Sequence, residues 1–567
     1  MLIYREADRP GRPALLLAQL ADRLQRLAGG GACPHAALVE LLIDFGELES
    51  AVADAACPAE DELLPLLDGF GQLSVMLGRL FWQSWRQGLD GAALAPLAPA
   101  LERLGAAALP EAVRLRVPEG YAYYALYPET YLEAAEQLLA ELRPQRVVCL
   151  GLRSIGSSLS AVVAGTLAMH GCPVRRHTLR PHGPPFERRP VPGPKLAAAL
   201  RDWADAYFLV VDEGPGLSGS SLCGTAAALT ALGVPEARIA FLPSWAPESL
   251  PFASADTRAR WPRHRKWLGS FEDLWLRSGR LGTALRDLGG GGWRAVLYEN
   301  EAAQPAVQPQ HERRKYLGAE GGVLLKFAGL GRYGAAKREL AERLAAAGFA
   351  PPVQDLRDGF LVSDFVPGRP LAAADLDSEL LNAALRYLDF RRRALPAART
   401  VDFEALCEMI SVNAAEGLGA DWRARLAPLA RYRRQVEAAA PVAVDGRMLP
   451  HEWLRTARGY LKTDGVDHHD DHFLPGAQDI AWDVAGFAVE FGLGEPVLRD
   501  FVQQLAARAG DGALAARLPF YRVAYLAFRL GYAQMAAGAL GGTPDGARMA
   551  ALARRYGGLL RQAVARL

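Results

Sequence analysis

The sequence predicts a protein that combines an α/β part with an α+β part. We expect a helical N-terminal region, a parallel doubly wound sheet, and a two-lobed domain whose second lobe is mostly helical. Three observations support this: Ala- and Leu-rich helical spacing over 13–115, alternating strand-like and helical segments over 134–243, and short strand-like runs followed by helical patterns beyond 311. A chain of 567 residues is too long for one core. The expected regions are residues 1–120, 121–250, 251–312 and 313–567.

The N-terminal region shows helical periodicity, to which we assign no chemistry. Runs such as 37–48 and 73–85 place apolar residues at helical spacing. Asp44 and Glu47 lie in the first run and Glu49 directly follows it, and all three are candidate ligands. A solvated helix face is the more ordinary interpretation, because the charged residues of an amphipathic helix usually face water.

Strands and helices alternate along the second region. This alternation is typical of a parallel sheet whose crossover connections are helices. The expected strands are 146–150, 174–179, 208–211 and 239–243, and the expected helices are 134–142, 159–169, 195–204 and 225–232.

One of these strands ends in a motif that suits a phosphorylated sugar. The run from Phe208 to Val211 ends on Asp212 and Glu213, and a Gly/Ser/Pro loop then leads into the next helix. Such a loop at a helix N-terminus collects backbone N–H groups that bind phosphate. The two carboxylates suit a diol or Mg²⁺.

The motif Val210-Val-Asp-Glu-Gly-Pro-Gly-Leu-Ser-Gly-Ser-Ser221 resembles that of the type I phosphoribosyltransferases, with Pro215 and Leu217 in place of small hydroxyl residues. The resemblance implies that Asp212 and Glu213 bind the ribose hydroxyls of phosphoribosyl pyrophosphate. It also implies that the 5′-phosphate binds to Gly216, Ser218, Gly219, Ser220 and Ser221.

Two further loops have counterparts in that family. The loop 151–158 lies where the family keeps its pyrophosphate loop, so Arg153 is expected to balance the charge of the leaving group. Residues 180–190 correspond to a mobile loop that closes over the site and excludes water. Arg180, Arg188 and Arg189 are candidates for neutralising pyrophosphate, or ordinary solvated loop charges. Some members of this fold only sense nucleotides, so binding without catalysis is an alternative.

The region 251–312 is irregular and rich in Trp and Arg, for example over 260–267. Aromatic and basic side chains together can stack on and neutralise a nucleotide. Packing at a domain junction explains the same composition, and we expect a connecting region.

Beyond residue 311 a second chemistry is expected. Leu324-Leu-Lys326 predicts a strand that ends on a lysine, and residues 337–347 predict a helix. With 362–368 and Asp479-Ile-Ala-Trp-Asp-Val-Ala485, these pieces resemble the aminoglycoside phosphotransferase and choline kinase group. The resemblance implies that Lys326 contacts the phosphates of ATP or another nucleoside triphosphate, and that Glu339 pairs with Lys326.

The catalytic loop departs from that group, because its His-Gly-Asp-x-His-x-x-x-Asn motif is absent from the sequence. Residues 450–454 stand in its place, so Glu452 is expected to accept the alcohol proton. Asp464 is expected to bind Mg²⁺. In another register Asp464 is the catalytic acid, and the cluster 467–472, beginning with Asp467, supplies metal ligands. That cluster would also suit Zn²⁺ or Mn²⁺, or form a polar loop.

Composition excludes several function classes. The formal net charge of +1 gives no strong nucleic-acid signal. No apolar run is long enough to cross a membrane, and the six cysteines show no CxxC spacing. The N-terminus lacks signal-peptide features, so a cytoplasmic protein is expected.

Two nucleotide-chemistry regions in one chain predict a bifunctional enzyme. The first would transfer ribose-5-phosphate from phosphoribosyl pyrophosphate to a base-like acceptor with Mg²⁺ assistance. The second would phosphorylate a small molecule with a nucleoside triphosphate. A regulatory nucleotide-binding protein with a pseudokinase domain is the main alternative, and removal of ribose-5-phosphate from a nucleotide is another. The expected partners are small-molecule substrates, and a homo-oligomer is possible.

Overall fold

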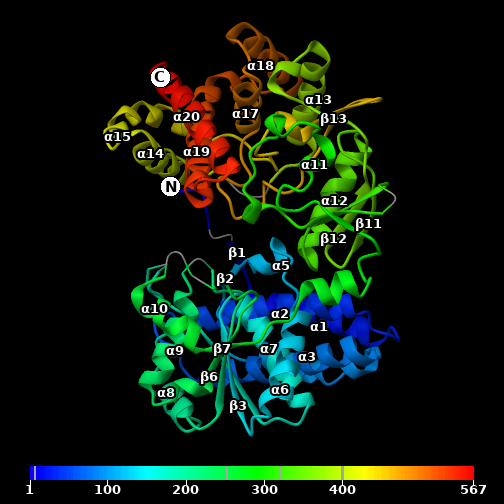
Figure 1. Cartoon of the computed structure of the whole chain (residues 1–567), viewed down its shortest axis with the longest axis vertical. Coiled ribbons are helices and arrows are strands. Elements are labelled where there is room, and N and C mark those ends of the chain that lie inside the picture. The colour runs from blue at the N-terminus through cyan, green and yellow to red at the C-terminus, as the bar shows by residue number, and fades with distance from the viewer. Residues whose placement is uncertain are drawn as a thin grey trace. The chain divides into compact units, whose positions relative to one another are not determined.

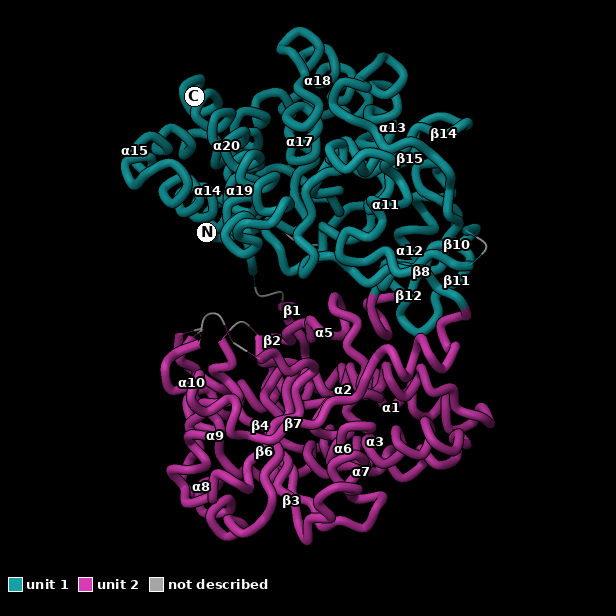
Figure 2. The backbone as a smooth tube through the Cα atoms, viewed as in Figure 1, with its two compact units in different colours: residues 1–7, 284–328, 335–567 teal, residues 8–283, 329–334 magenta. Residues whose placement is uncertain are grey.

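The computed structural model describes residues 1–5, 8–184, 186–216, 218–248, 250, 253–319, 321–397 and 401–567. The chain forms two compact units, which Figure 2 distinguishes by colour. We call residues 8–283 and 329–334 the N-terminal unit, and residues 1–7, 284–328 and 335–567 the C-terminal unit. The helical and sheet regions expected over 1–120 and 121–250 therefore share one unit. The expected connecting region, 251–312, is divided between the two.

A five-stranded parallel sheet forms the centre of the N-terminal unit, as predicted (Figure 1). Its strand order is β4-β3-β5-β6-β7, so the chain reverses direction across the sheet between β3 and β5. In open parallel sheets, ligands bind beyond the carboxyl ends of the strands at this switch point. The strands are β3 (Val147–Leu152), β4 (Val174–Leu179), β5 (Tyr207–Val211), β6 (Ile239–Leu242) and β7 (Arg265–Lys266).

The N-terminal helices form an outer layer over this sheet. On one face, α7 (Ile155–Met169) packs directly on the strands, and α2 (His35–Ala56) and α3 (Pro65–Gln87) pack over α7. The contact between α3 and α7 is very close, since a Cβ added to Gly165 would lie 2.2 Å from the carbonyl carbon of Gly78. This double cover explains why nearly every residue of α7 is buried.

The opposite face of the sheet is covered by α8 (Pro194–Arg201) and α9 (Ser220–Ala231), whose Leu196 and Leu222 pack in one core cluster with β5. The remaining elements of the unit are β1 (Asp8–Gly11), α1 (Pro13–Ala28), η1 (Gly91–Leu94), α4 (Leu97–Gly105), β2 (Val113–Arg116), α5 (Glu119–Ala122), α6 (Pro128–Leu142), η2 (Glu236–Arg238), α10 (Ala255–Arg260), η3 (Trp261–Arg263) and η4 (Glu272–Arg277).

The acidic residues of α2 do not form the solvated helix face that we expected. Glu47 and Glu49 are 5% and 3% exposed. Glu47 pairs with Arg332 and accepts a hydrogen bond from Tyr333 at 2.8 Å. Glu49 accepts both arms of the buried Arg176 guanidinium at 2.7 and 2.8 Å. These acids are therefore structural, because each neutralises a cation from a distant part of the chain.

Replacing Arg176 by Met should destabilise the N-terminal unit by about 3–5 kcal/mol, because it leaves the Glu49 carboxylate buried without its cation. We expect a lower midpoint for one transition in thermal unfolding followed by circular dichroism. The exposed Arg201 provides the control, and Arg201→Met should leave that midpoint unchanged. Equal losses in both variants would mean that the buried pair is not responsible.

An antiparallel sheet opens the C-terminal unit. Its order is β11-β12-β10-β9-β8, and α12 (Arg332–Ala346) connects β10 to β11 along the chain. Lys326 lies near the end of β10, as the sequence predicted. The strands are β8 (Arg286–Asp287), β9 (Lys315–Leu317), β10 (Val323–Phe327), β11 (Val353–Arg357) and β12 (Phe360–Asp364).

The rest of the C-terminal unit is mostly helical around α19 (Leu514–Leu540), which packs on α14, α17 and α20. A small antiparallel sheet carries the loops between residues 445 and 472. The elements are α11 (Arg294–Leu297), η5 (Glu301–Ala303), η6 (Pro309–His311), β13 (Arg369–Pro370), η7 (Ala373–Asp375), α13 (Ser378–Ala394), α14 (Phe403–Leu418), α15 (Trp422–Arg425), η8 (Ala427–Tyr432), α16 (Arg433–Glu437), η9 (Pro450–Glu452), β14 (Trp453–Thr456), β15 (Gly459–Lys462), α17 (Ala481–Phe491), α18 (Glu495–Ala509) and α20 (Pro544–Val564).

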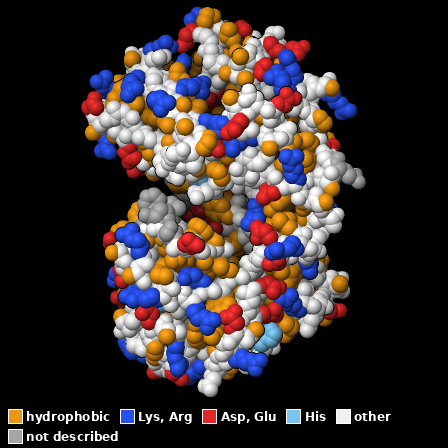
Figure 3. Space-filling view, in the orientation of Figure 1, with side chains coloured by type: hydrophobic (Ala, Val, Ile, Leu, Met, Phe, Trp, Pro, Cys, Tyr) orange, Lys and Arg blue, Asp and Glu red, His pale blue; other side chains and the backbone are white. Residues whose placement is uncertain are grey.

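Surface charge is mixed rather than segregated. Lys and Arg side chains intermingle with Asp and Glu side chains on the face shown in Figure 3, in keeping with the net charge of +1. Among the described residues, no helix has both the length and the apolar character needed to span a bilayer.

Candidate functional site

The C-terminal unit contains a cavity of about 760 Å³. Apolar side chains such as Leu324, Val366 and Leu449 line part of it, and a group of charged side chains converges on another part. A cavity with apolar walls and a few converging polar groups is typical of a small-molecule site. The convergent charged group consists of Lys326, Arg447, Glu452, Asp464, Asp467 and His468.

Lys326 places an ammonium group in this cavity from the sheet. It forms ion pairs with Asp464 and with Asp467, whose Oδ2 lies 2.5 Å from Nζ. Burial lowers the pKa of Lys326 to about 8, and Asp467 opposes this shift. At pH 7 the ammonium group therefore still carries its charge.

Glu339 does not meet Lys326 as we expected. It lies exposed on α12, and the acidic partners of Lys326 among the described residues are Asp464 and Asp467. The helix turns Lys337 inward instead, and the Nζ of Lys337 lies 3.4 Å from Asp467 Oδ1. Residues two positions apart on a helix face different sides. The sequence alone did not show which of Lys337 and Glu339 faces inward.

The start of α17 holds the backbone just before the expected catalytic segment at 450–454. The carboxylate of Asp483 accepts the backbone N–H groups of Asp445 and Gly446 at 2.7 and 2.8 Å. Burial, with the nearby Asp445, raises the pKa of Asp483 to about 7. Asp445 and Arg447 were missed from the sequence, although the Asp-Gly-Arg run just before residue 450 was a usable signal.

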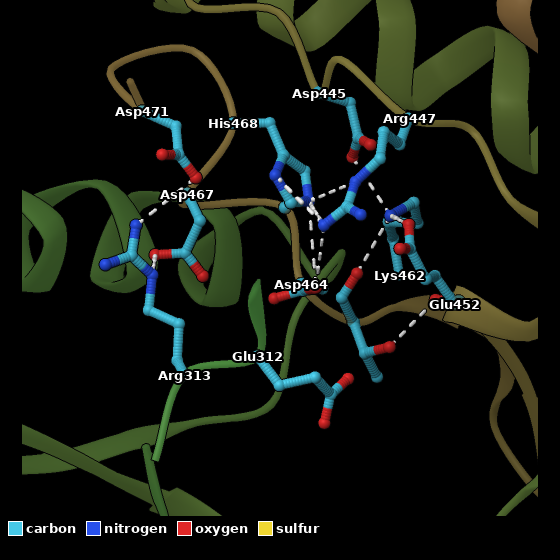
Figure 4. Close-up of polar contacts among 12 residues, drawn as sticks. Glu312, Arg313, Asp445, Arg447, Glu452, Lys462, Asp464, Asp467, His468 and Asp471 are labelled. Carbon is cyan, nitrogen blue, oxygen red and sulfur yellow. Dashed lines mark hydrogen bonds and ion pairs between the residues drawn. The ribbon is translucent and has the colours of Figure 1, made fainter. Parts of the chain in front are cut away.

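Figure 4 shows how Asp445, Lys462 and Glu452 join into one network. Lys462 is 2% exposed, and its Nζ lies 2.9 Å from Glu452 Oε2 and 3.1 Å from Asp445 Oδ2. Burial would raise the pKa of Glu452, but Lys462 and Arg447 outweigh burial and lower it. A carboxylate with a lowered pKa is a weak proton acceptor but a good ligand for a cation.

Three residues fit a divalent cation. Ligand atoms of Glu452, Asp464 and His468 all lie within 4.8 Å of one another. Burial and the neighbouring Arg447 lower the pKa of His468 to about 3, so the imidazole is neutral and able to ligate. The two carboxylates suit Mg²⁺, and the carboxylates together with the imidazole suit a first-row transition metal. Arg447 shares this group, because its Nε lies 3.1 Å from His468 Nε2.

Asp467, an expected metal ligand, lies outside this three-residue group. Its carboxylate faces Lys326, and its Oδ1 lies 3.4 Å from both Lys337 Nζ and Arg313 Nε. Burial would raise its pKa, but these three cations hold it well below the usual range. Asp471 likewise pairs with Arg313 and His472. The second half of the 467–472 cluster therefore contributes internal ion pairs.

In the N-terminal unit, Asp212 and Glu213 follow β5 at the switch point of the sheet, where both are half-buried. Glu213 Oε2 accepts the backbone N–H of Gly120 at 3.1 Å, and the hydroxyl of Tyr131 donates to the carbonyl of Asp212 at 2.7 Å. Burial raises the pKa of Asp212 to about 6. Burial, then Glu119 and Asp212, raises that of Glu213 to about 8. Raised pKa values at a sheet end are typical of functional carboxylates.

The loop after these acids has the backbone expected of an anion nest. Gly216 and Gly219 have φ angles of 61° and 65°, a left-handed region that favours glycine. Gly219 caps α9, and Ser218 Oγ accepts the backbone N–H of Ser220 at 3.3 Å. Ser221 lies in the first turn of α9. Leu217 lies outside the described residues.

Arg153 is held by acids that the sequence did not connect with it. It is 4% exposed and pairs with Asp61 and, at 3.0 Å, with Asp54. Arg180 also pairs with Asp54 and donates to the carbonyl of Arg153 at 2.7 Å. Both guanidinium groups are thus neutralised internally rather than presented to a leaving group. Arg189 is exposed in the same 180–190 segment.

No protein-family model and no curated protein sequence matches the chain. Over about half of its length the chain is similar to solved structures of small-molecule kinases. A choline kinase from Streptococcus pneumoniae is 12% identical over 44% of this chain and 89% of its own, with a TM-score of 0.32. A choline/ethanolamine kinase family protein from Mesorhizobium loti is 16% identical over 48% of this chain and 98% of its own, with a TM-score of 0.31. An aminoglycoside phosphotransferase from Streptomyces rimosus is 21% identical over 45% of this chain and 97% of its own, with a TM-score of 0.28.

Proposed function

We propose that the C-terminal unit binds a nucleoside triphosphate and transfers its terminal phosphoryl group to a small molecule. The observation that carries this proposal is the meeting of Lys326 with Asp464 and Asp467 in a cavity that also has apolar walls. The apolar walls would contact the base of the nucleoside triphosphate, and the charged group would bind its phosphates. Such reactions need positioning and charge neutralisation rather than a covalent nucleophile.

The residues of the charged group other than Asp467 have roles in this proposal. The ammonium of Lys326 would bind phosphate oxygens. Glu452 and Asp464 would hold a Mg²⁺ ion through carboxylate oxygens, with the His468 imidazole beside it, and the ion neutralises charge on the phosphates when bound. Arg447 would add a fixed positive charge beside them. Asp464 is the better candidate acceptor of the substrate's hydroxyl proton, because Lys462 and Arg447 lower the pKa of Glu452 and make it a weaker one.

For the N-terminal unit we propose binding of phosphoribosyl pyrophosphate with Mg²⁺ and transfer of ribose-5-phosphate to a base-like acceptor. Support comes from the gathering of Asp212, Glu213 and the 216–221 loop at the switch point of the sheet. The two activities together make a bifunctional enzyme of nucleotide-like metabolite synthesis. The alternative is a regulatory protein with a pseudokinase unit. Arg447 favours it, because its guanidinium contacts His468 in the group that would otherwise bind the metal ion.

A thermal-shift screen tests both proposals with the full chain. Phosphoribosyl pyrophosphate with Mg²⁺ and a non-hydrolysable ATP analogue with Mg²⁺ should each raise an unfolding midpoint, because a ligand that binds only the folded state stabilises it by mass action. Product analysis after incubation with ATP or phosphoribosyl pyrophosphate and candidate acceptors then separates an enzyme from a sensor. An unchanged midpoint with phosphoribosyl pyrophosphate would contradict the proposal for the N-terminal unit. An unchanged midpoint with the ATP analogue would contradict the proposal for the C-terminal unit.

Binding of ribose 5-phosphate to the N-terminal unit should depend on pH. The pKa of Glu213 is raised to about 8, so the carboxyl is mostly protonated at pH 7 and ionised at pH 9. An ionised carboxylate accepts hydrogen bonds from ribose hydroxyls, so affinity should rise about tenfold from pH 7 to pH 9. Titration calorimetry of Glu213→Gln should show a flat profile over this range. An equally steep profile in that variant would assign the pH dependence to another group.

A further inference from the structure

The cavity of the C-terminal unit has a second part, distant in sequence from Lys326. Its side chains come from α19 and α20 with one from α17. We call this part the basic arm. The residues that define it are Arg529, Tyr532, Arg548, Arg555, Tyr556 and Glu490.

Arg529 is the central side chain of the basic arm. It is 5% exposed, and its Nε and Nη2 lie 3.3 and 3.2 Å from the hydroxyl oxygen of Tyr556. Its Nη1 is buried without a hydrogen-bond partner among the described residues. A buried guanidinium N–H that lacks an acceptor is costly, and a ligand oxygen in the cavity would satisfy it.

Glu490, the only acid among the residues that define the basic arm, is already fully engaged. One carboxylate oxygen accepts the hydroxyls of Tyr525 and Tyr556, each at 2.8 Å, and the other accepts Arg555 at 3.0 Å. Glu490 is 3% exposed. Glu490 Oε1 also lies 3.6 Å from Arg529 Nε, and Arg548 pairs with Asp545 at 3.2 Å. What the basic arm offers a ligand is therefore guanidinium and hydroxyl donors, among them the unpaired Nη1 of Arg529.

Arg447 and His451 line the same cavity as the basic arm. An anion bound at Arg529 would lie in a partly desolvated site, where charge-assisted hydrogen bonds to a guanidinium group are strong.

We infer that the molecule phosphorylated by the C-terminal unit is itself anionic and carries a phosphate group that binds Arg529 in the basic arm. This inference rests on the proposed phosphoryl transfer, and it specifies the class of acceptor. A compound built on ribose-5-phosphate, the product class proposed for the N-terminal unit, carries such a phosphate. The two proposed reactions would then act in sequence on one molecule.

The test uses the full chain with Asp212→Asn and Glu213→Gln, which we expect to weaken ribose 5-phosphate binding at the N-terminal unit. Titration calorimetry with a non-hydrolysable ATP analogue and Mg²⁺ present should show binding of ribose 5-phosphate, but not of ribose or choline. Adding Arg529→Gln should weaken that binding at least about tenfold, as expected when a charged hydrogen-bond donor is lost. Arg548→Gln, at a less buried position of the basic arm, should weaken it as well. Arg554→Gln, exposed on α20, should leave it unchanged.

Thermal unfolding of each variant separates lost binding from lost folding, and Arg529→Lys should restore part of the affinity. Binding of choline or ribose as tight as that of ribose 5-phosphate would overturn the inference. So would unchanged binding in both Arg529→Gln and Arg548→Gln. If the ATP analogue itself fails to bind the unsubstituted chain, the proposed function fails. If the analogue binds and ribose 5-phosphate does not, only the acceptor inference fails.

Discussion

Replacing Lys326 by Met should reduce nucleotide affinity at least about 100-fold, because the side chain would lose two or more charge-assisted hydrogen bonds to phosphate oxygens. The fold should survive the change. Asp467 would keep Arg313 and Lys337 as neighbours, so its buried carboxylate would not be left without a cation. Calorimetric titration of a non-hydrolysable ATP analogue with Mg²⁺ gives the measurement.

Lys195→Met, an exposed substitution in the N-terminal unit, is the matched control for loss of a lysine charge. It should bind the analogue as tightly as the unsubstituted chain. An affinity for Lys326→Met within about threefold of the control would remove Lys326 from the site and, with it, the observation that carries the proposed function.

The double substitution Asp212→Asn with Glu213→Gln should abolish binding of phosphoribosyl pyrophosphate while nucleotide binding at Lys326 is retained. The amides keep the shape of the carboxyls but lose the charge that would hold a diol or Mg²⁺. Burial raises the pKa of both groups, which means that the folded protein disfavours their ionised forms. The variant, with neutral amides in their place, should therefore be at least as stable as the parent.

Calorimetry with phosphoribosyl pyrophosphate and Mg²⁺ measures the loss, and the ATP analogue serves as the internal control. Thermal unfolding shows whether the N-terminal unit is intact. Unchanged binding of phosphoribosyl pyrophosphate in a folded variant would contradict the assignment of this site.

Local features of the sequence were sufficient for the elements that carry the sites. The apolar run at residues 208–211 is β5, the predicted strand 174–179 matches β4 residue for residue, and Lys326 lies near the end of β10. Periodicity and turn residues act over a few positions, so a single chain displays them. The placement of residues 212–221 at the end of the sheet followed from the same local signals.

Long-range ion pairs were not predictable in this way. Arg153 was expected to face a ligand, but it is buried against Asp54 and Asp61, which lie 99 and 92 positions earlier. Glu339 was expected beside Lys326, but Asp467, 141 positions further along, takes that place. Of the expected solvated acids of α2, Glu47 and Glu49 proved buried and Asp44 half-buried, because α2 forms a layer over α7.

By itself the sequence determined the alternation of strands and helices over 146–243, the acidic Gly/Ser loop after β5 and the lysine of β10, because these depend on neighbours in the chain. Only the tertiary structure decided which charges meet: Lys326 with Asp467, Asp483 with the loop at Asp445, and Arg529 with Glu490 and the cavity. The physical reason is that a buried charge needs a partner in space, and packing chooses that partner without regard to distance along the chain.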